Sequence, residues 1–169
     1  FMLGHPGKKL LFMGQEFAQL QEWSEARELD WYLLKEERHW QMQNYVRALL
    51  TLYRNYPALY QADNDPKGFE WVNANDNSRS IFSFIRHSDT GRNNLLFVIN
   101  FTPVARPDYR VGVPRRKLYQ LVLSSDDTQF GGSGKERPDK YQAVKSECDG
   151  RPFSFGYDLP AYGVAVFKF

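Results

Sequence analysis

The first apolar run of the chain covers residues 10–13, within the stretch KKLLFMGQEF. An uninterrupted apolar run without alternation is typical of a strand buried on both faces, as in a parallel sheet. It ends at Gly14, and a polar loop follows that contains Glu16 and extends to about residue 31. The pattern predicts a buried strand at 10–13 and then a long loop.

A helical pattern follows the loop, over residues 36–56. Its apolar residues are spaced 3, 1, 3, 4 and 3 positions apart, which places them on one face of a helix: Met42, Tyr45, Val46, Leu49, Tyr53 and Tyr56. Glu36 and Glu37 suit the positive end of the helix dipole, and Pro57 disfavours helical geometry at the residue before it. We therefore expect one strand, one loop and one helix in the first third of the chain.

From about residue 68 the pattern changes to short apolar runs separated by turn residues. In FSFGYDL, residues 153–159, large apolar residues alternate strictly with small or polar ones, as in a half-buried strand. The seven predicted strands lie at 69–74, 80–86, 94–101, 109–113, 118–123, 153–159 and 162–169. Strands at this spacing with no helix between them favour an antiparallel sandwich.

The two patterns divide the chain into residues 1–62 and residues 68–169, joined by the linker QADNDPKG. One strand and one helix cannot form a parallel sheet by themselves. We expect the neighbouring strands to belong to an upstream part of a longer protein, in keeping with a chain that starts at Phe1 rather than Met. The predicted fold class is mainly β, an antiparallel sandwich preceded by a strand-loop-helix unit.

Composition narrows the function classes. There are 22 Lys+Arg against 20 Asp+Glu, so the charge favours neither a nucleic acid nor a membrane surface as a partner. No apolar run approaches the roughly 20 residues that span a bilayer, and no signal peptide is visible. The single cysteine, Cys148, favours a reducing compartment, so we expect a cytoplasmic location. The aromatic content of 16% suits a sugar ligand as well as a core.

Several segments carry a resemblance that covers essentially the whole chain. They are HPGKKLLFMGQEF, EW, LDW with the helix after it, GFEWVNANDNSRSIFSFIR, VINFTPVARPDYRVGVP, FGGSG and RPFSFGYDLPAYGVAVFKF. Together they resemble the C-terminal part of bacterial-type 1,4-α-glucan (glycogen) branching enzymes of the α-amylase clan. The resemblance departs in the loop, where Gln21 and Glu22 replace a frequent arginine and residues 24–26 replace an Asn-His-Asp run.

The resemblance implies a catalytic (β/α)₈ barrel whose eighth strand, loop and helix are residues 1–62, followed by an all-β domain at 68–169. Such enzymes cleave an α-1,4-glucan and transfer the cut segment to a 6-hydroxyl, with one carboxylate as nucleophile and another as acid and base. The family's catalytic motifs do not occur here. We therefore expect no catalytic residue, cofactor or metal in this chain, and no activity from it alone. The implied partners are an α-glucan, such as glycogen or amylose, and the upstream barrel.

Four loop residues are candidate glucan contacts: Glu16, Trp23, Asp30 and Trp31. Glu16 follows the end of the predicted strand, where barrel enzymes place their sites, but we favour the alternative that it caps or braces its own loop. An indole face can cover a sugar ring while a carboxylate accepts its hydroxyls, which favours Asp30 with Trp31. The alternative is that the tryptophans only pin the loop, and we favour that reading for Trp23.

Two other readings of the chain stay open. It could be a free-standing α-glucan-binding module, or a structural β-sandwich that shields a barrel. Because the apolar face of the helix, through Tyr45, Leu49 and Tyr53, would cover a barrel in a longer protein, we expect the chain alone to self-associate or to pack this region differently.

Overall fold

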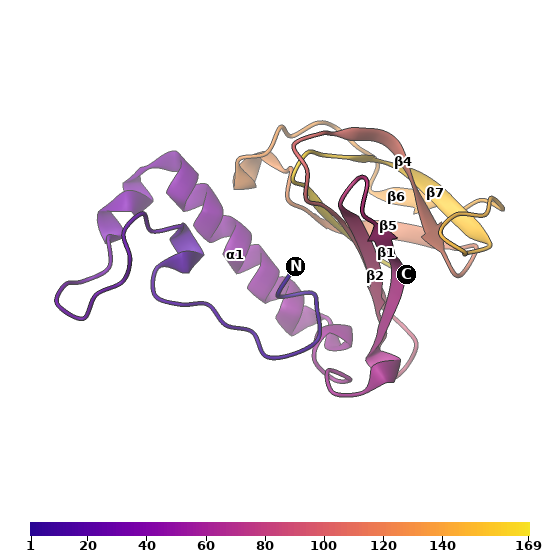
Figure 1. The fold of residues 1–169 in the computed structure, drawn as a ribbon, viewed down its shortest axis with the longest axis horizontal. Helices are drawn as coiled ribbons and strands as arrows, with labels where there is room; N and C mark the ends of the chain where they lie inside the picture. The colour runs from indigo at the N-terminus through magenta and orange to yellow at the C-terminus, as the bar shows by residue number, and fades with distance from the viewer.

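The computed structural model describes all residues, 1–169, as one long helix beside a β-sandwich (Figure 1). Helix α1 covers Glu37–Asn55. The strands are β1 Phe69–Asp76, β2 Ile81–Arg86, β3 Leu95–Asn100, β4 Arg106–Val113, β5 Leu118–Ser124, β6 Lys140–Gln142, β7 Phe153–Leu159 and β8 Val164–Lys168. Short 3₁₀ helices used below are η1 Gln15–Phe17, η2 Trp31–Lys35 and η5 Thr128–Phe130.

The strands form two sheets, and every pairing is antiparallel. The large sheet has the order β1-β2-β3-β8-β5-β6, and the small sheet pairs β4 with β7. The mainly β fold class and all seven predicted strands are confirmed. The sequence pattern missed only β6, whose three residues are too few for alternation to mark a strand.

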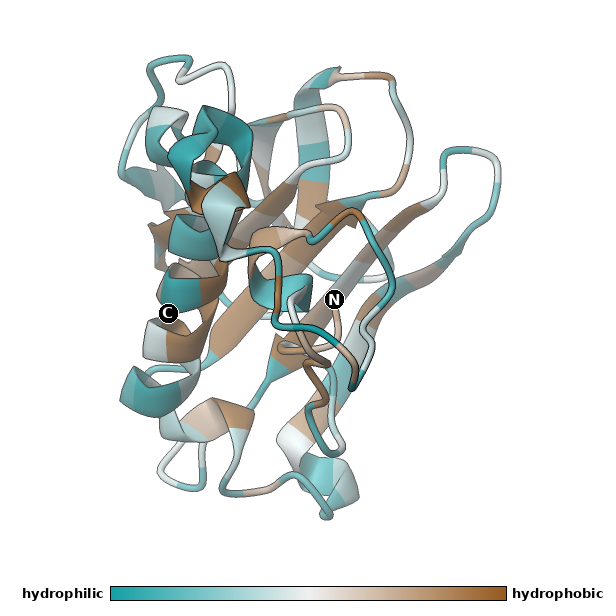
Figure 2. Ribbon diagram, turned by 90° about the vertical axis from the view of Figure 1, so that its left-hand side faces the viewer, coloured by the Kyte–Doolittle hydropathy of each residue, from teal (hydrophilic) through white to brown (hydrophobic).

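A first apolar core fills the space between the two sheets. Val111 and Phe155 of the small sheet pack with Leu96, Val98 and Phe167 of the large sheet. The strict alternation of FSFGYDL reflects this core, because Phe155, Tyr157 and Leu159 all point into it. Apolar residues accordingly run along the strands, whereas polar residues dominate the connecting loops (Figure 2).

A second core covers the opposite face of the large sheet. Leu95, Phe97 and Ile99 of β3 point to this side, where Leu52 of α1 is buried with them. Also packed against the core are Tyr45, Ala48, Leu49, Tyr53 and Tyr56 of the helical segment. The central strands of the large sheet are thus buried on both faces.

The predicted helix is confirmed to within one residue at each end, but its apolar face has a different partner from the expected one. Tyr45, Leu49 and Tyr53 pack against the sandwich core and are therefore not left open. Burial raises the pKa of Tyr45 to about 12, in keeping with this packing. In a longer protein this face is expected to cover a barrel; within this chain the second face of the large sheet covers it.

The predicted strand at residues 10–13 is not formed. These residues have no regular secondary structure, and all four side chains are exposed. A strand needs a neighbouring strand to bond its N–H and C=O groups, and both sheets of this fold are complete without residues 10–13. Exposed apolar side chains are concentrated here and in the loop that follows, while on α1 Trp40 and Leu50 are also exposed.

The predicted linker at residues 61–68 is fixed to the sandwich by a buried arginine. Arg86 of β2 is fully buried, and its Nη2 donates to Oδ1 of Asp63 over 2.6 Å. Its remaining donors reach the carbonyls of Gly68 at 3.3 Å and Gly4 at 2.8 Å. Gly7 donates its N–H to the other oxygen of Asp63 over 3.1 Å. One buried guanidinium therefore ties the first residues of the chain to the sheet.

No helix in this fold has both the length and the apolar character needed to cross a bilayer.

Candidate functional site

The four candidate residues lie in the segment that leads into α1, where η1 and η2 pack against the helix (Figure 1). Gly14 precedes η1 with φ +84°, a left-handed conformation that glycine adopts without strain. A Cβ at Gly14 would lie 2.8 Å from the Cβ of Gln19, because the loop folds back on itself there. The Gln19 N–H donates to the Gly14 carbonyl over 3.0 Å and closes this turn.

Trp31 is held by Phe17, which sequence analysis did not single out. The Phe17 side chain is fully buried, and its ring centroid lies 5.1 Å from that of Trp31. His39 of α1 hydrogen-bonds through Nδ1 to the Phe17 carbonyl over 2.8 Å. Trp31 nevertheless keeps 47% of its surface exposed. The arrangement fixes an indole ring and leaves part of it open to a ligand.

Asp30 lies beside Trp31 with an unused acceptor. Its N–H donates to Oε1 of Gln19 over 2.9 Å, and its carbonyl accepts from the Leu33 N–H over 2.9 Å. Its side-chain Oδ2 is buried without a hydrogen-bond partner. Buried polar atoms in native proteins are nearly always satisfied by protein or by water, so this oxygen can accept from solvent, a ligand or a neighbouring segment.

Glu16 and Trp23 are less closely connected to this cluster. Glu16 lies in η1, is half-buried, and makes no hydrogen bond or ion pair within the chain. Trp23 packs edge-on against Phe12, with ring centroids 5.5 Å apart, on the outer part of the loop. The structure therefore brings Phe17, Asp30 and Trp31 together and leaves Trp23 in a separate aromatic pair.

Sequence reasoning missed three supporting residues, Phe17, Gln19 and His39. Phe17 was detectable in principle, as an apolar residue surrounded by polar ones. Gln19 and His39 could not be identified from their sequence neighbours. Gln19 contacts Asp30, 11 positions away, and His39 contacts Phe17, 22 positions away. There is no group of three or more His, Cys, Asp or Glu arranged to hold a metal ion.

Comparisons with known proteins agree with this architecture. Residues 71–169 match the family described as alpha amylase, C-terminal all-beta domain. The whole chain is 53% identical to a 1,4-alpha-glucan branching enzyme, GlgB, of Butyrivibrio fibrisolvens, of which it covers 26%. It is 43% identical over 168 residues to GlgB of Bacillus caldolyticus, of which it covers 25%. The chain thus spans about a quarter of the length of these relatives.

A solved structure shares the fold at low sequence identity. It is a mutant of MutB from crystals soaked with trehalulose, with a TM-score of 0.51 and 13% identity. The match covers 84% of this chain and 20% of that one.

Proposed function

This chain belongs to the family of α-amylase C-terminal all-β domains, and we propose that it is the C-terminal part of a 1,4-α-glucan branching enzyme. The observation that carries the proposal is the 53% identity to such an enzyme over all 169 residues. In this proposal the longer protein transfers cleaved α-1,4-glucan segments to 6-hydroxyls and forms α-1,6 branches in glycogen synthesis. Its setting is the cytoplasm, in keeping with a single free cysteine.

Within the longer protein, residues 1–62 complete the catalytic barrel and residues 68–169 form an adjoining β domain. The exposed apolar run at 10–13 supports this assignment, because strands of an upstream barrel would supply the missing pairing partners. The carboxylates that break and form glycosidic bonds then belong to the upstream part. This chain alone is inactive.

We assign the loop a role in holding the glucan. The unpartnered Oδ2 of Asp30 and the exposed indole of Trp31 support an acceptor and a stacking surface for one sugar unit. Glu16 would orient the substrate or a catalytic neighbour, and Trp23 is the least favoured contact because its ring is used against Phe12.

The 169-residue chain by itself is expected to self-associate. Leu10 and Phe12 are exposed, as are Leu20 and Tyr32 in the same loop, and exposed apolar side chains of this kind promote association. In the longer protein the same surface would meet the barrel.

The test of the proposed function compares the longer gene product with this chain on amylose. The longer protein should reduce the iodine colour and create α-1,6 linkages that a debranching enzyme removes, while the chain alone does neither. Absence of new α-1,6 linkages from the longer protein would overturn the assignment.

The loop role is tested separately in the longer protein. Asp30→Asn and Trp31→Ala should each raise KM for amylose by about fivefold or more, the usual effect of truncating an anchoring contact. Trp23→Ala is the matched control and should change KM less. Unchanged KM in both loop variants would remove Asp30 and Trp31 from the substrate site.

A second candidate, a purely structural role for residues 68–169, is favoured by the two filled cores of the sandwich. It is compatible with the first proposal, because a domain can support a barrel without touching glucan.

A further inference from the structure

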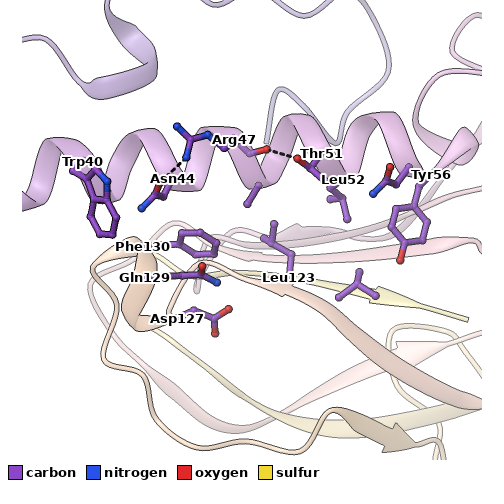
Figure 3. Close-up of a pocket in the computed structure, with 13 residues that line it drawn as sticks. Trp40, Asn44, Arg47, Thr51, Leu52, Tyr56, Leu123, Asp127, Gln129 and Phe130 are labelled. Atoms are coloured by element: carbon purple, nitrogen blue, oxygen red, sulfur yellow. Dashed lines mark hydrogen bonds between the residues drawn. The ribbon is translucent and has the colours of Figure 1, made fainter. Parts of the chain in front are cut away.

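A cleft of about 620 Å³ lies between α1 and the segment that joins β5 to η5 (Figure 3). It shares no residue with the loop of Asp30 and Trp31. Leu52 of the helix and Leu123 of β5 are buried at its base. The walls above this base carry polar and aromatic side chains.

The helix contributes a polar stripe to the cleft. Asn44, Arg47, Thr51 and Asn55 follow one another at intervals of three or four residues, so they lie on one side of α1. Arg47 donates through Nη1 to Oδ1 of Asn44 over 3.1 Å, which couples these two side chains. The amide NH₂ of Asn44 and the whole side-chain amide of Asn55 make no hydrogen bond within the chain.

Two aromatic rings border the same cleft. Trp40, at the start of the helix, keeps 48% of its surface exposed, and in Figure 3 its ring points from α1 toward η5. Phe130 of η5 faces the helix and is fixed there by Tyr45, with ring centroids 5.2 Å apart. Gly131 then passes so close to α1 that a Cβ on it would lie 2.6 Å from Oε1 of Gln41. The position of η5 is thus set by direct contact with the helix.

The opposite wall supplies acceptors without partners. The side chains of Asp127 and Gln129 line the cleft, and neither makes a hydrogen bond or ion pair within the chain. Partial burial raises the pKa of Asp127 even though Arg137 acts to lower it. A partly dehydrated carboxylate without a partner is stabilised by hydroxyl donors that enter the cleft.

We propose that this cleft is an accessory binding site for a segment of α-glucan. The chemistry fits, because the indole of Trp40 can cover the C–H face of a glucose ring while Asn44, Asp127 and Gln129 exchange hydrogen bonds with its hydroxyls. The choice of α-glucan as the ligand rests on the proposed function. The aromatic and polar residues that line the cleft are observed independently of it.

The distribution of exposed residues separates this site from a protein-docking surface. Exposed apolar residues gather in the loop, at Leu10, Phe12 and Leu20, whereas the helix wall of the cleft combines the exposed Trp40 and a buried apolar base with amides, a hydroxyl and a guanidinium. The centre of a protein interface is typically an aromatic and aliphatic surface with few charges. The loop has this character and would contact the barrel, whereas the polar groups of the cleft can bind the hydroxyls of a sugar.

Calorimetric titration of the 169-residue chain with maltoheptaose tests the proposal. The wild-type chain should bind, and Trp40→Ala or Asp127→Ala should each weaken binding at least about fivefold, the loss expected for truncating an anchor. Tyr162→Ala removes an exposed aromatic residue outside the cleft and should bind like the wild type. Circular dichroism of each variant establishes that it is folded.

Each outcome has a definite meaning. No binding by the wild-type chain, or equal binding by folded Trp40→Ala and Asp127→Ala, overturns the cleft site. The same two substitutions in the longer protein should weaken its binding of maltoheptaose, and no change there would also overturn it. Failure of the longer protein to form α-1,6 linkages, with cleft binding intact, would overturn the proposed function but not the cleft.

Discussion

Residues 10–13 and strand β3 are both uninterrupted apolar runs, LLFM and LLFVI, yet they have opposite fates. The five apolar residues of β3 are all buried. In residues 10–13 the exposed fractions are 71%, 39%, 47% and 51%. Composition alone therefore does not decide whether such a run becomes a core strand.

The difference lies in what surrounds each run. β3 pairs with β2 on one edge and β8 on the other, and a core covers each of its faces. Residues 10–13 pair with no strand of this chain, and their side chains stay exposed apart from local contacts such as that of Phe12 with Trp23. An apolar run of this kind becomes a core strand only where partners cover it, and in the proposed function the upstream barrel would be the partner of residues 10–13.

The largest effect is expected at Arg86, which links the first residues of the chain to the large sheet. Arg86→Met should lower the free energy of unfolding by about 3–5 kcal/mol, because it leaves Asp63 and two carbonyls without their buried donor. Urea unfolding measures the loss. Arg54→Met, at an exposed position of α1, is the matched control. A loss as small as that of the control would mean that Arg86 does not hold the first residues of the chain to the large sheet.

A paired substitution tests the comparison itself. Leu96→Ala should cost about 2–5 kcal/mol, since it opens a cavity in a filled core. Leu10→Ala, in the exposed run, should stay within about 0.5 kcal/mol of the wild type. Urea unfolding of both chains gives the two values side by side. A comparable cost at Leu10 would show that residues 10–13 are packed in solution.

Self-association should depend on the exposed run and not on the sandwich. Phe12→Lys should reduce the association of the 169-residue chain, because it places a charge in the apolar surface. Analytical ultracentrifugation over a concentration series measures the change. The control adds Lys145→Phe to the Phe12→Lys chain. It places an apolar side chain at an exposed loop position beside the small sheet, and it should not restore the association. Identical behaviour of Phe12→Lys and the wild type would place the contact elsewhere.

The smallest effect concerns the single thiol of the sandwich. Burial, followed by the neighbouring Asp149, raises the pKa of Cys148 to about 11. At pH 8.5 the folded chain therefore holds little thiolate, and alkylation by iodoacetamide should be at least about tenfold slower than in urea. Because the thiol loses its proton at higher pH in the folded chain, the folded state loses stability as pH rises from 9.0, the unfolded pKa, to about 11. Equal rates in the folded and unfolded chains would contradict the shift.

The candidate site was only partly predictable. Trp31 and Asp30 could be chosen from residue types that suit sugars, but their support by Phe17 and Gln19 depends on how the loop folds back at Gly14. The accessory cleft could not be foreseen from the sequence. Its walls come from α1 and from residues 122–130, more than 60 positions later, and the packing of Tyr45 on Phe130 and of Leu52 with Leu123 in the second core brings them together.

The sequence by itself determined the helix that ends before Pro57 and the strands of the sandwich, such as FSFGYDL, because side-chain period and turn residues act over a few positions. It also determined the family, through a resemblance over the whole chain. Only the tertiary structure decided what each apolar face meets. It placed the Tyr45–Tyr53 face of the helix on the sheet, buried Arg86 with Asp63, and left residues 10–13 open. Burial is a relation between distant segments, and an apolar pattern states only that some partner is needed.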